Sequence, residues 1–294
     1  MRKFPSYGEI VEASLEILKQ YDTPITLRQL YYRLVSRRMF PNTLNSYKRL
    51  SRIMVKARER GDIPLNAIED RSRRILGRGD VGYHSVEEFL RRRIRGFIES
   101  WKEFTMPMWE DQPCYLLISL EKDALSRLVS QVANRYAVRT FPTRGYPSFS
   151  YVLRMAQYIR ERLKGKETII LYLGDFDPSG VDIERDLAER LRRYGAGDFT
   201  VKRVALTREQ IIKYQLPPMP VKRSDARAPR FVAAYGDEAV ELDALDPNEL
   251  KRIIAEAIES HIDMELWRKR EREIEELREW LRERLRSIED VILD

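Results

Sequence analysis

The feature that most constrains the fold is an alternation of short apolar runs with helical patterns, which begins at Cys114. Four apolar runs have the length of buried strands, and the segments between them have the residue spacing of helices. The predicted strands are Cys114–Leu120, Tyr136–Phe141, Thr168–Leu173 and Phe199–Leu206, and the predicted helices are Ala124–Ala133, Phe149–Leu163 and Val181–Tyr194. Parallel strands need such crossover helices, so the alternation predicts an α/β fold with a parallel sheet.

The residues before and after this block are predominantly helical in pattern. Short helices are expected at Gly8–Tyr21, Leu27–Arg38 and Ser46–Arg60, followed by a small wing or hairpin at Ile63–Ile75. That order is typical of a winged-helix module. The predicted organisation is a winged-helix domain at 1–80, a linker helix at 81–110, the α/β domain at 111–246 and C-terminal helices at 247–294.

Positive charge is concentrated at the N-terminal end. The 294 residues carry a net charge of +7, yet residues 1–78 alone hold 17 Lys and Arg against 8 Asp and Glu. This asymmetry indicates a polyanionic partner, with nucleic acid favoured over a membrane surface. Cys114 is the only cysteine, which excludes an internal disulfide and a Cys-cluster zinc site. With no apolar run of membrane-spanning length, a cytoplasmic protein is expected.

Three acidic residues follow two of the predicted strands. Glu121 comes directly after the first strand, and Asp175 and Asp177 follow the third within Gly-Asp-Phe-Asp-Pro-Ser-Gly. The carboxyl ends of parallel strands form one crevice, so these carboxylates are predicted to converge as ligands of Mg²⁺. Glu241 and Asp243 also alternate along a short strand-like segment, Ala239–Leu245, and are interpreted as structural.

The third predicted helix carries a row of positive side chains. Lys48, Arg52, Lys56 and Arg60 stand four residues apart, with Arg49 beside them. Such a row fits contacts to DNA phosphates. The alternative is a solvated surface helix.

The second predicted helix contains two adjacent tyrosines with different expected roles. At about 100° per residue, Tyr31 falls on the apolar stripe with Leu30 and Leu34. Tyr32 falls outside that stripe, on the same face as Arg28, and is predicted to point outward. A nearby guanidinium favours the phenolate form of a tyrosine, which is the form that attacks phosphorus.

Separated motifs in this order resemble one known family. Arg28-Gln-Leu-Tyr-Tyr32 is similar to the Arg-Asp-Ile-Tyr-Tyr signature of the topoisomerase VI A subunit and the related meiotic double-strand-break transesterase. Glu121-Lys-Asp-Ala, Gly145-Tyr-Pro and Asp175-Phe-Asp-Pro-Ser-Gly180 resemble motifs of that family's Toprim domain. In its length, the chain resembles the compact, stand-alone prokaryotic relatives of that subunit.

The resemblance implies a DNA-cleaving transesterase related to type IIB topoisomerases. Tyr32 would be the nucleophile, assisted by Arg28, with Mg²⁺ held by Glu121, Asp175 and Asp177. Transesterification conserves bond energy, so religation is allowed. The sequence has no phosphate-binding loop of the Gly-x4-Gly-Lys type, so any ATP dependence would come from a separate ATPase subunit. A prokaryotic, nucleoid-associated location follows.

Cutting both strands of a duplex requires two nucleophiles, and one chain supplies one. A two-fold homodimer is therefore expected, and in the resembled family each active site combines the tyrosine of one protomer with the metal of the other. In the final predicted helix, Trp267, Ile274, Leu281 and Ile288 recur every seven residues. This stripe fits pairing between protomers or packing within the chain.

Two other functions are consistent with the sequence. In a hydrolytic Toprim nuclease, water would replace Tyr32 as the attacking group and the substrate would be DNA or RNA. In a non-catalytic winged-helix regulator, the chain would bind DNA and the acidic residues would have no chemical role. A Tyr32→Phe protein that still cleaves with Mg²⁺ would select the hydrolytic nuclease. Any cleavage by the wild-type chain would exclude the non-catalytic regulator.

Overall fold

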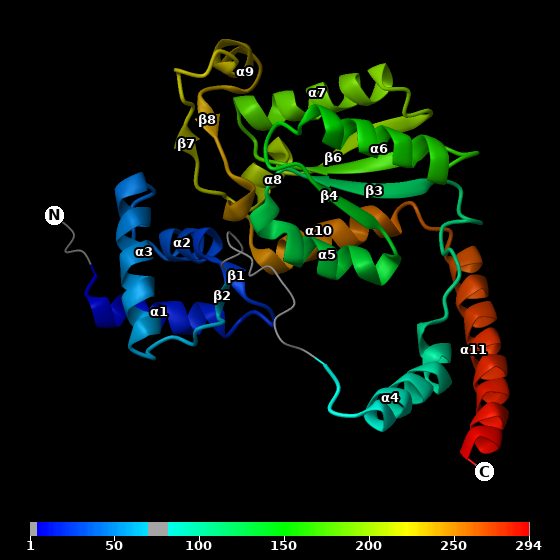
Figure 1. The fold of residues 1–294 in the computed structure, drawn as a ribbon. Coiled ribbons are helices and arrows are strands. Elements are labelled where there is room, and N and C mark those ends of the chain that lie inside the picture. The colour runs from blue at the N-terminus through cyan, green and yellow to red at the C-terminus, as the bar shows by residue number, and fades with distance from the viewer. Residues whose placement is uncertain (1–4, 70–81, 294) are drawn as a thin grey trace. The chain divides into compact units, whose positions relative to one another are not determined.

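The computed structural model describes residues 5–69 and 82–293, with side chains as far as residue 287. The chain folds as two compact units (Figure 1). The first consists of Met1–Ser72 and Cys114–His261, and the second of Arg73–Pro113 and Ile262–Asp294.

A four-stranded parallel sheet forms the centre of the first unit. Its strands are β3 (Tyr115–Leu120), β4 (Arg139–Pro142), β5 (Thr168–Leu173) and β6 (Phe199–Ala205). They lie in the order β4-β3-β5-β6, and each neighbouring pair is parallel. The predicted α/β fold with a parallel sheet is thus confirmed. Leu120 and Leu173 are register partners, so the residues that follow β3 and β5 emerge at the same edge.

Helices cover both faces of the sheet (Figure 1). They are α5 (Ser126–Ala133), preceded by the turn η2 (Asp123–Leu125), α6 (Phe149–Arg162), α7 (Pro178–Arg193) and α10 (Pro247–Glu259). Val152 and Met155 of α6 and Leu187 of α7 are buried in one cluster with Leu117 and Ile170 of the sheet. Each such side chain contributes about 1.5–3 kcal/mol through removal from water. This core fixes the strand ends that carry the acidic residues.

Two predicted strands differ from the structure. The second was expected from Tyr136, but Asn134–Tyr136 forms the turn η3 and Ala137 has a left-handed backbone with φ of 52°, so β4 begins at Arg139. The expected strand Ala239–Leu245 is mostly the single turn η4 (Leu242–Ala244), which follows β8 (Glu238–Ala239). β8 pairs with β7 (Met219–Pro220), and α8 (Arg208–Lys213) and α9 (Ala228–Tyr235) complete this region.

The N-terminal helices are α1 (Tyr7–Leu18), α2 (Leu27–Ser36) and α3 (Leu44–Glu59). Ser6, Thr26 and Thr43 cap them by accepting backbone hydrogen bonds. The strands β1 (Ile25–Thr26) and β2 (Ile68–Glu69) pair in parallel. β2 comes from the predicted wing, whose residues 70–75 lie outside the described part of the chain.

The second unit contains α4 (Val86–Ile98), η1 (Ser100–Glu103) and the 30-residue helix α11 (Met264–Leu293). Trp267 of α11 packs edge-on against Trp109, with ring centroids 5.8 Å apart. The heptad stripe therefore contributes to packing within its own unit. Among the described residues, no helix combines the length and the apolar character that a bilayer span requires.

Candidate active site

Glu121 and Asp175 meet at the carboxyl edge of the sheet, as their strand positions predicted. The Asp175 backbone N–H donates to Glu121 Oε2 at 3.0 Å, and the two residues are only 9% and 7% exposed. Asp177 lies at the start of α7, where its Oδ1 accepts from the Gly180 N–H at 2.7 Å. Asp177 thus caps a helix with one oxygen while its charge acts on Glu121.

The electrostatics of this edge show repulsion between buried carboxylates. Burial raises the pKa of Glu121, and the charge of Asp177 adds to the rise. Burial also raises the pKa of Asp175 to about 7, a shift that Lys122 opposes and Glu121 reinforces. A cation at this edge would relieve the repulsion and favour the charged forms.

Two glycines allow the close approach of these groups. A Cβ atom on Gly174 would lie 2.7 Å from Glu121 Oε2, and one on Gly180 would lie 2.2 Å from the Asp175 carbonyl oxygen. Neither position has room for a side chain. Gly180, which ends the Asp-x-Asp-Pro-x-Gly motif, and Gly174, which directly precedes it, are therefore packing requirements of the carboxylate edge.

Residues 240–246, here called the bridging segment, run along this edge and join it to the N-terminal helices. Val240 and Phe176 exchange backbone hydrogen bonds of 2.9 and 3.0 Å, which anchors the segment next to the acidic motif. The Leu242 N–H donates to Asp175 Oδ1 at 2.7 Å. One oxygen of Asp175 is thereby oriented by backbone, which leaves Oδ2 for other partners.

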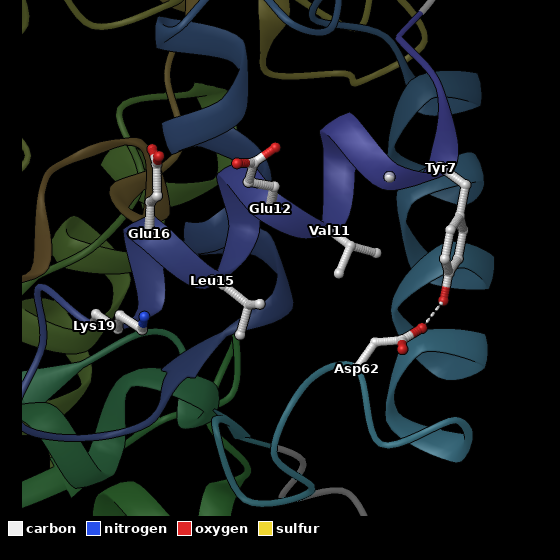
Figure 2. Close-up of a pocket in the computed structure, with 8 residues that line it drawn as sticks. Tyr7, Val11, Glu12, Leu15, Glu16, Lys19 and Asp62 are labelled. Carbon is white, nitrogen blue, oxygen red and sulfur yellow. Dashed lines mark hydrogen bonds between the residues drawn. The ribbon is translucent and has the colours of Figure 1, made fainter.

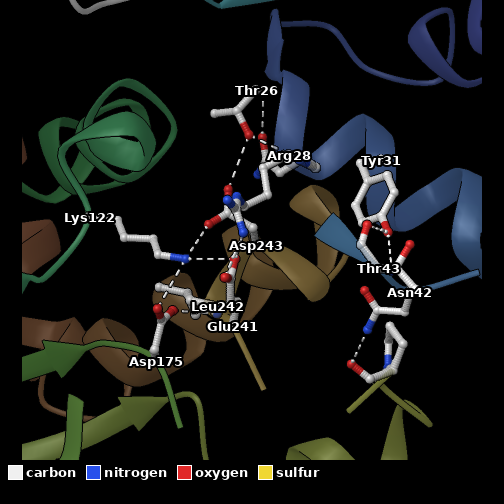
Figure 3. Close-up of polar contacts among 12 residues, drawn as sticks. Thr26, Arg28, Tyr31, Asn42, Thr43, Lys122, Asp175, Glu241, Leu242 and Asp243 are labelled. Carbon is white, nitrogen blue, oxygen red and sulfur yellow. Dashed lines mark hydrogen bonds and ion pairs between the residues drawn. The ribbon is translucent and has the colours of Figure 1, made fainter. Parts of the chain in front are cut away.

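The Lys122 ammonium lies where three carboxylates meet (Figure 3). Its Nζ is 2.8 Å from Asp243 Oδ2, 3.1 Å from Asp175 Oδ2 and 3.2 Å from Glu241 Oε2. The lysine side chain is 22% exposed and that of Asp243 only 2%. Because opposite charges surround it, Lys122 keeps its proton, and its pKa lies above the ordinary lysine value despite its burial.

The bridging segment also holds helix α2 (Figure 3). Arg28 Nη1 contacts both oxygens of Glu241 at 2.6 Å, and Thr26 Oγ1 donates to Asp243 Oδ1 at 3.1 Å. Further along α2, Arg33 donates to the Ala244 carbonyl oxygen. A continuous set of polar contacts therefore connects α2 to Asp175.

The structure corrects the predicted orientation of Tyr32. The side chain is 1% exposed rather than outward-facing, and Tyr31 is buried as expected, at 3%. The helical wheel considered α2 alone, whereas in the fold α2 packs against η4, and Arg28, on the same face as Tyr32, pairs with Glu241. Burial and the charge of Glu241 raise the pKa of the Tyr32 phenol, and the opposing effects of Arg28 and Lys122 are smaller. Arg28 therefore does not produce a phenolate here, since it is paired with Glu241.

A cleft of about 730 Å³ opens between the N-terminal helices and the acidic edge. Arg28 and Tyr47 line one side, and Asp175 and Asp177 line the other. The remaining charged lining residues are Arg58, Glu69, Lys122, Asp123, Lys222, Glu241 and Asp243. The lining has four basic and six acidic side chains, a net negative balance that favours a cation as the first ligand and a phosphate only together with it.

The predicted basic row lies on α3 and its C-cap. Lys48, Arg52, Lys56 and Arg60 are exposed, whereas Arg49 is half-buried and donates to the Pro5 carbonyl oxygen at 3.1 Å. The wall that α3 gives to the cleft consists of Tyr47, Ser51, Val55 and Arg58. The row therefore occupies other faces of the same helix.

A second hollow, of about 570 Å³, lies along α1 (Figure 2). The Tyr7 hydroxyl donates to Asp62 Oδ2 at 2.6 Å at one end of it. Lys56 and Arg60 lie over the Tyr7 ring, each 5.6 Å from its centroid. These contacts tie the end of the basic row to α1.

The three predicted metal ligands fit Mg²⁺ in donor chemistry. All are carboxylates, and buried carboxylates that repel one another form a favourable environment for a hard cation. Within residues 5–69 and 82–293, however, no three acidic, histidine or cysteine side chains are grouped so as to hold a metal ion. Asp175 Oδ2 instead faces the Lys122 ammonium. Metal binding thus requires these side chains to rearrange.

Sequence reasoning missed part of this site. Lys122 stands in the Glu-Lys-Asp-Ala motif, but the sequence assigns it no role. Glu241 and Asp243 alternate along the chain, and that pattern alone indicates a structural role. Their partners Arg28 and Thr26 precede them by 213 and 217 residues. Only the tertiary fold reveals these pairs.

Comparison with known protein families and with curated proteins gives no match to this chain.

Proposed function

We propose that this chain cleaves DNA strands by transesterification, with Tyr32 as the attacking group and Mg²⁺ as the required cation. One observation carries the proposal. The Tyr32 phenol is close enough to Glu241, Lys122 and Asp243 for their charges to act on it, and those residues contact Asp175 or its lysine partner. Tyr32 and the carboxylate edge are thus both within electrostatic range of Glu241, Lys122 and Asp243, and these three residues line the cleft.

In this reaction the Tyr32 oxygen bonds to phosphorus, and the bond from phosphorus to a strand oxygen breaks. The leaving strand oxygen takes a proton from water, so the products are a phosphotyrosyl link and a strand that ends in a hydroxyl group. The phenol must first lose its proton, which we assign to Glu241, the carboxylate with the largest electrostatic effect on the phenol. Arg28, freed by protonation of Glu241, would then face the phosphate in the cleft.

Glu121, Asp175 and Asp177 would hold the cation. A bound Mg²⁺ supplies charge stabilisation for a phosphoryl group that becomes more negative during transfer. The exposed row Lys48, Arg52, Lys56 and Arg60, with Arg49 beside it, would position the duplex through its phosphates. A homodimer would supply the two nucleophiles for a double-strand break, and an ATPase subunit would be a separate partner.

The burial of Tyr32 favours a second candidate, a hydrolytic nuclease at the same edge. A phenol that is 1% exposed and has a raised pKa is a poor nucleophile until α2 moves. Water in the cleft would then attack in its place, and the substrate would be DNA or RNA.

The deciding experiment uses supercoiled DNA, Mg²⁺ and denaturation, followed by detection of DNA covalently attached to protein. We expect an adduct with the wild-type chain, loss of adduct and of cleavage with Tyr32→Phe, and retention of both with the control Tyr31→Phe. Cleavage by Tyr32→Phe without an adduct would establish the hydrolytic alternative. DNA binding without cleavage by the wild-type chain would contradict both candidates.

A further inference from the structure

We propose that the Lys122 ammonium is an internal counter-cation that competes with a divalent ion for Asp175. This inference rests on the metal-dependent function proposed above. It adds a positioning residue, Lys122, which acts through the carboxylates around it.

The position of Lys122 supports direct competition. Its Nζ is 3.1 Å from Asp175 Oδ2, while Asp175 Oδ1 accepts from the Leu242 N–H. A divalent ion bound to Oδ2 would therefore replace the ammonium or lie within a few ångströms of it. Like charges at that distance repel strongly where water is largely excluded. The ammonium and the ion cannot both occupy this position.

Lys122 also neutralises the carboxylates that contact the N-terminal end of α2. Lys122 links Asp175 to Glu241 and Asp243, which in turn hold Arg28 and Thr26 of α2. With the ammonium displaced, Glu241 would still be paired with Arg28 and Asp243 with the Thr26 hydroxyl, so the contacts to α2 persist while Lys122 leaves Asp175.

The first test measures Mn²⁺ binding to the full-length protein without DNA, by titration calorimetry. We expect Lys122→Gln to bind Mn²⁺ about tenfold more tightly than the wild type, which corresponds to the removal of a modest competing interaction. Lys122→Arg, which keeps the charge, should restore wild-type affinity. The matched control is Lys251→Gln, because Lys251 of α10 is also a largely buried lysine in an ion pair, but its partner is Asp22 and neither residue lines the cleft. Unchanged or weaker Mn²⁺ binding by Lys122→Gln would overturn the proposal.

The second test uses only the wild-type protein and therefore does not depend on the folding of a variant. Lysine acylation followed by mass spectrometry reports the accessibility of each amine with and without Mn²⁺. We expect Mn²⁺ to increase acylation of Lys122 several-fold and to leave Lys251 unchanged. Mn²⁺ binding without any change at Lys122 would overturn the competition. Neither measurement involves DNA or Tyr32, so failure of transesterification would appear separately, as a missing protein–DNA adduct.

Discussion

Glu241 is a single side chain that joins cations from two distant parts of the chain. It contacts Arg28 at 2.6 Å and Lys122 at 3.2 Å, and its side chain is 19% exposed. Partly buried charge networks lose more than exposed pairs when one member is removed, because a desolvated charge is left without compensation. The interactions of Glu241 should therefore contribute measurably to folding.

We expect Glu241→Ala to lower the free energy of unfolding by about 1–2 kcal/mol, below the cost of breaking a fully buried pair because Arg28 retains access to solvent. Glu249→Ala is the control, since Glu249 pairs with Arg252 at 2.7 Å on the exposed face of α10. That substitution should cost less than about 0.5 kcal/mol. Urea denaturation measures both, and equal losses would show that the network around Glu241 has no special role in stability.

Asp175 predicts a dependence of stability on pH in the metal-free protein. Its folded-state pKa of about 7 lies above the unfolded value of about 3.9. Between these values the folded state binds the extra proton, so this group's contribution to stability falls as pH rises from about 4 to about 7. Asp175→Asn should therefore raise the melting temperature near pH 8 and flatten the pH profile.

The control is Asp225, whose effect on the pH dependence of stability has the opposite sign. Hydrogen bonds from Arg227 lower the pKa of Asp225 to about 2, so its ionised form stabilises the fold at neutral pH. Asp225→Asn should lower the melting temperature near pH 8, with a small effect because Asp225 is partly exposed. Scanning calorimetry with a chelator present compares the two variants, and a lower melting temperature for Asp175→Asn would contradict the assignment.

Helix α2 is fixed to the rest of the unit at its N-cap, Thr26, as well as along its length. Thr26 Oγ1 accepts from the Gln29 N–H at 3.0 Å and donates to Asp243 at 3.1 Å. The Thr26 N–H in turn donates to Gln29 Oε1 at 2.8 Å. The cap therefore has a local and a tertiary function. Ser6 of α1 forms the same kind of capping box, but its hydrogen bonds are exposed.

We expect Thr26→Ala to cost about 2 kcal/mol, the sum of a lost cap and a lost buried hydrogen bond. Ser6→Ala should cost about 0.5–1 kcal/mol, the effect of an exposed cap alone. Thr26→Ser keeps the hydroxyl and should recover most of the difference. Chemical denaturation of the three variants checks this order, and similar losses for both alanine variants would mean that the contact to Asp243 is energetically neutral.

The sequence predicted those elements whose pattern is local. β3 and β5 appear close to their predicted bounds because their side chains are continuously apolar, and the parallel order then brings Glu121 and Asp175 together. The bridging segment was not predictable in this way. Its short turn has no periodicity, and its partners on α2 precede it by more than 200 residues. The burial of Tyr32 depends on that same long-range packing.

The distribution of charge over the molecule predicts how DNA binding depends on salt. Arg52 is exposed on α3 within the basic row, and Arg162 is exposed at the end of α6, away from that row. Arg52→Gln should weaken binding to any duplex sequence and reduce the slope of log Kd against log salt by about 1. Arg162→Gln should change neither quantity. Fluorescence anisotropy over a range of salt concentrations measures both, and equal effects would assign binding to net charge alone.

Each active site of the proposed homodimer takes its tyrosine and its carboxylates either from one chain or from both chains. The resemblance implies that each site combines Tyr32 of one protomer with the carboxylates of the other. Within this chain, however, α2 is already linked to its own Asp175 through Glu241, Asp243 and Lys122. We therefore expect the tyrosine and the carboxylates of one site to come from the same chain.

Mixing two inactive variants distinguishes these arrangements. In a mixed dimer of Tyr32→Phe and Asp175→Asn, each chain lacks one component, so sites formed within one chain all stay inactive. Sites formed between chains would include one with an intact tyrosine and an intact aspartate, and cleavage of one strand would return. We expect no cleavage after co-refolding of the two variants, with wild-type protein treated identically as the control for recovery. Nicking by the mixture would show that α2 leaves its own bridging segment and acts on the partner, because only that exchange can unite the two intact residues.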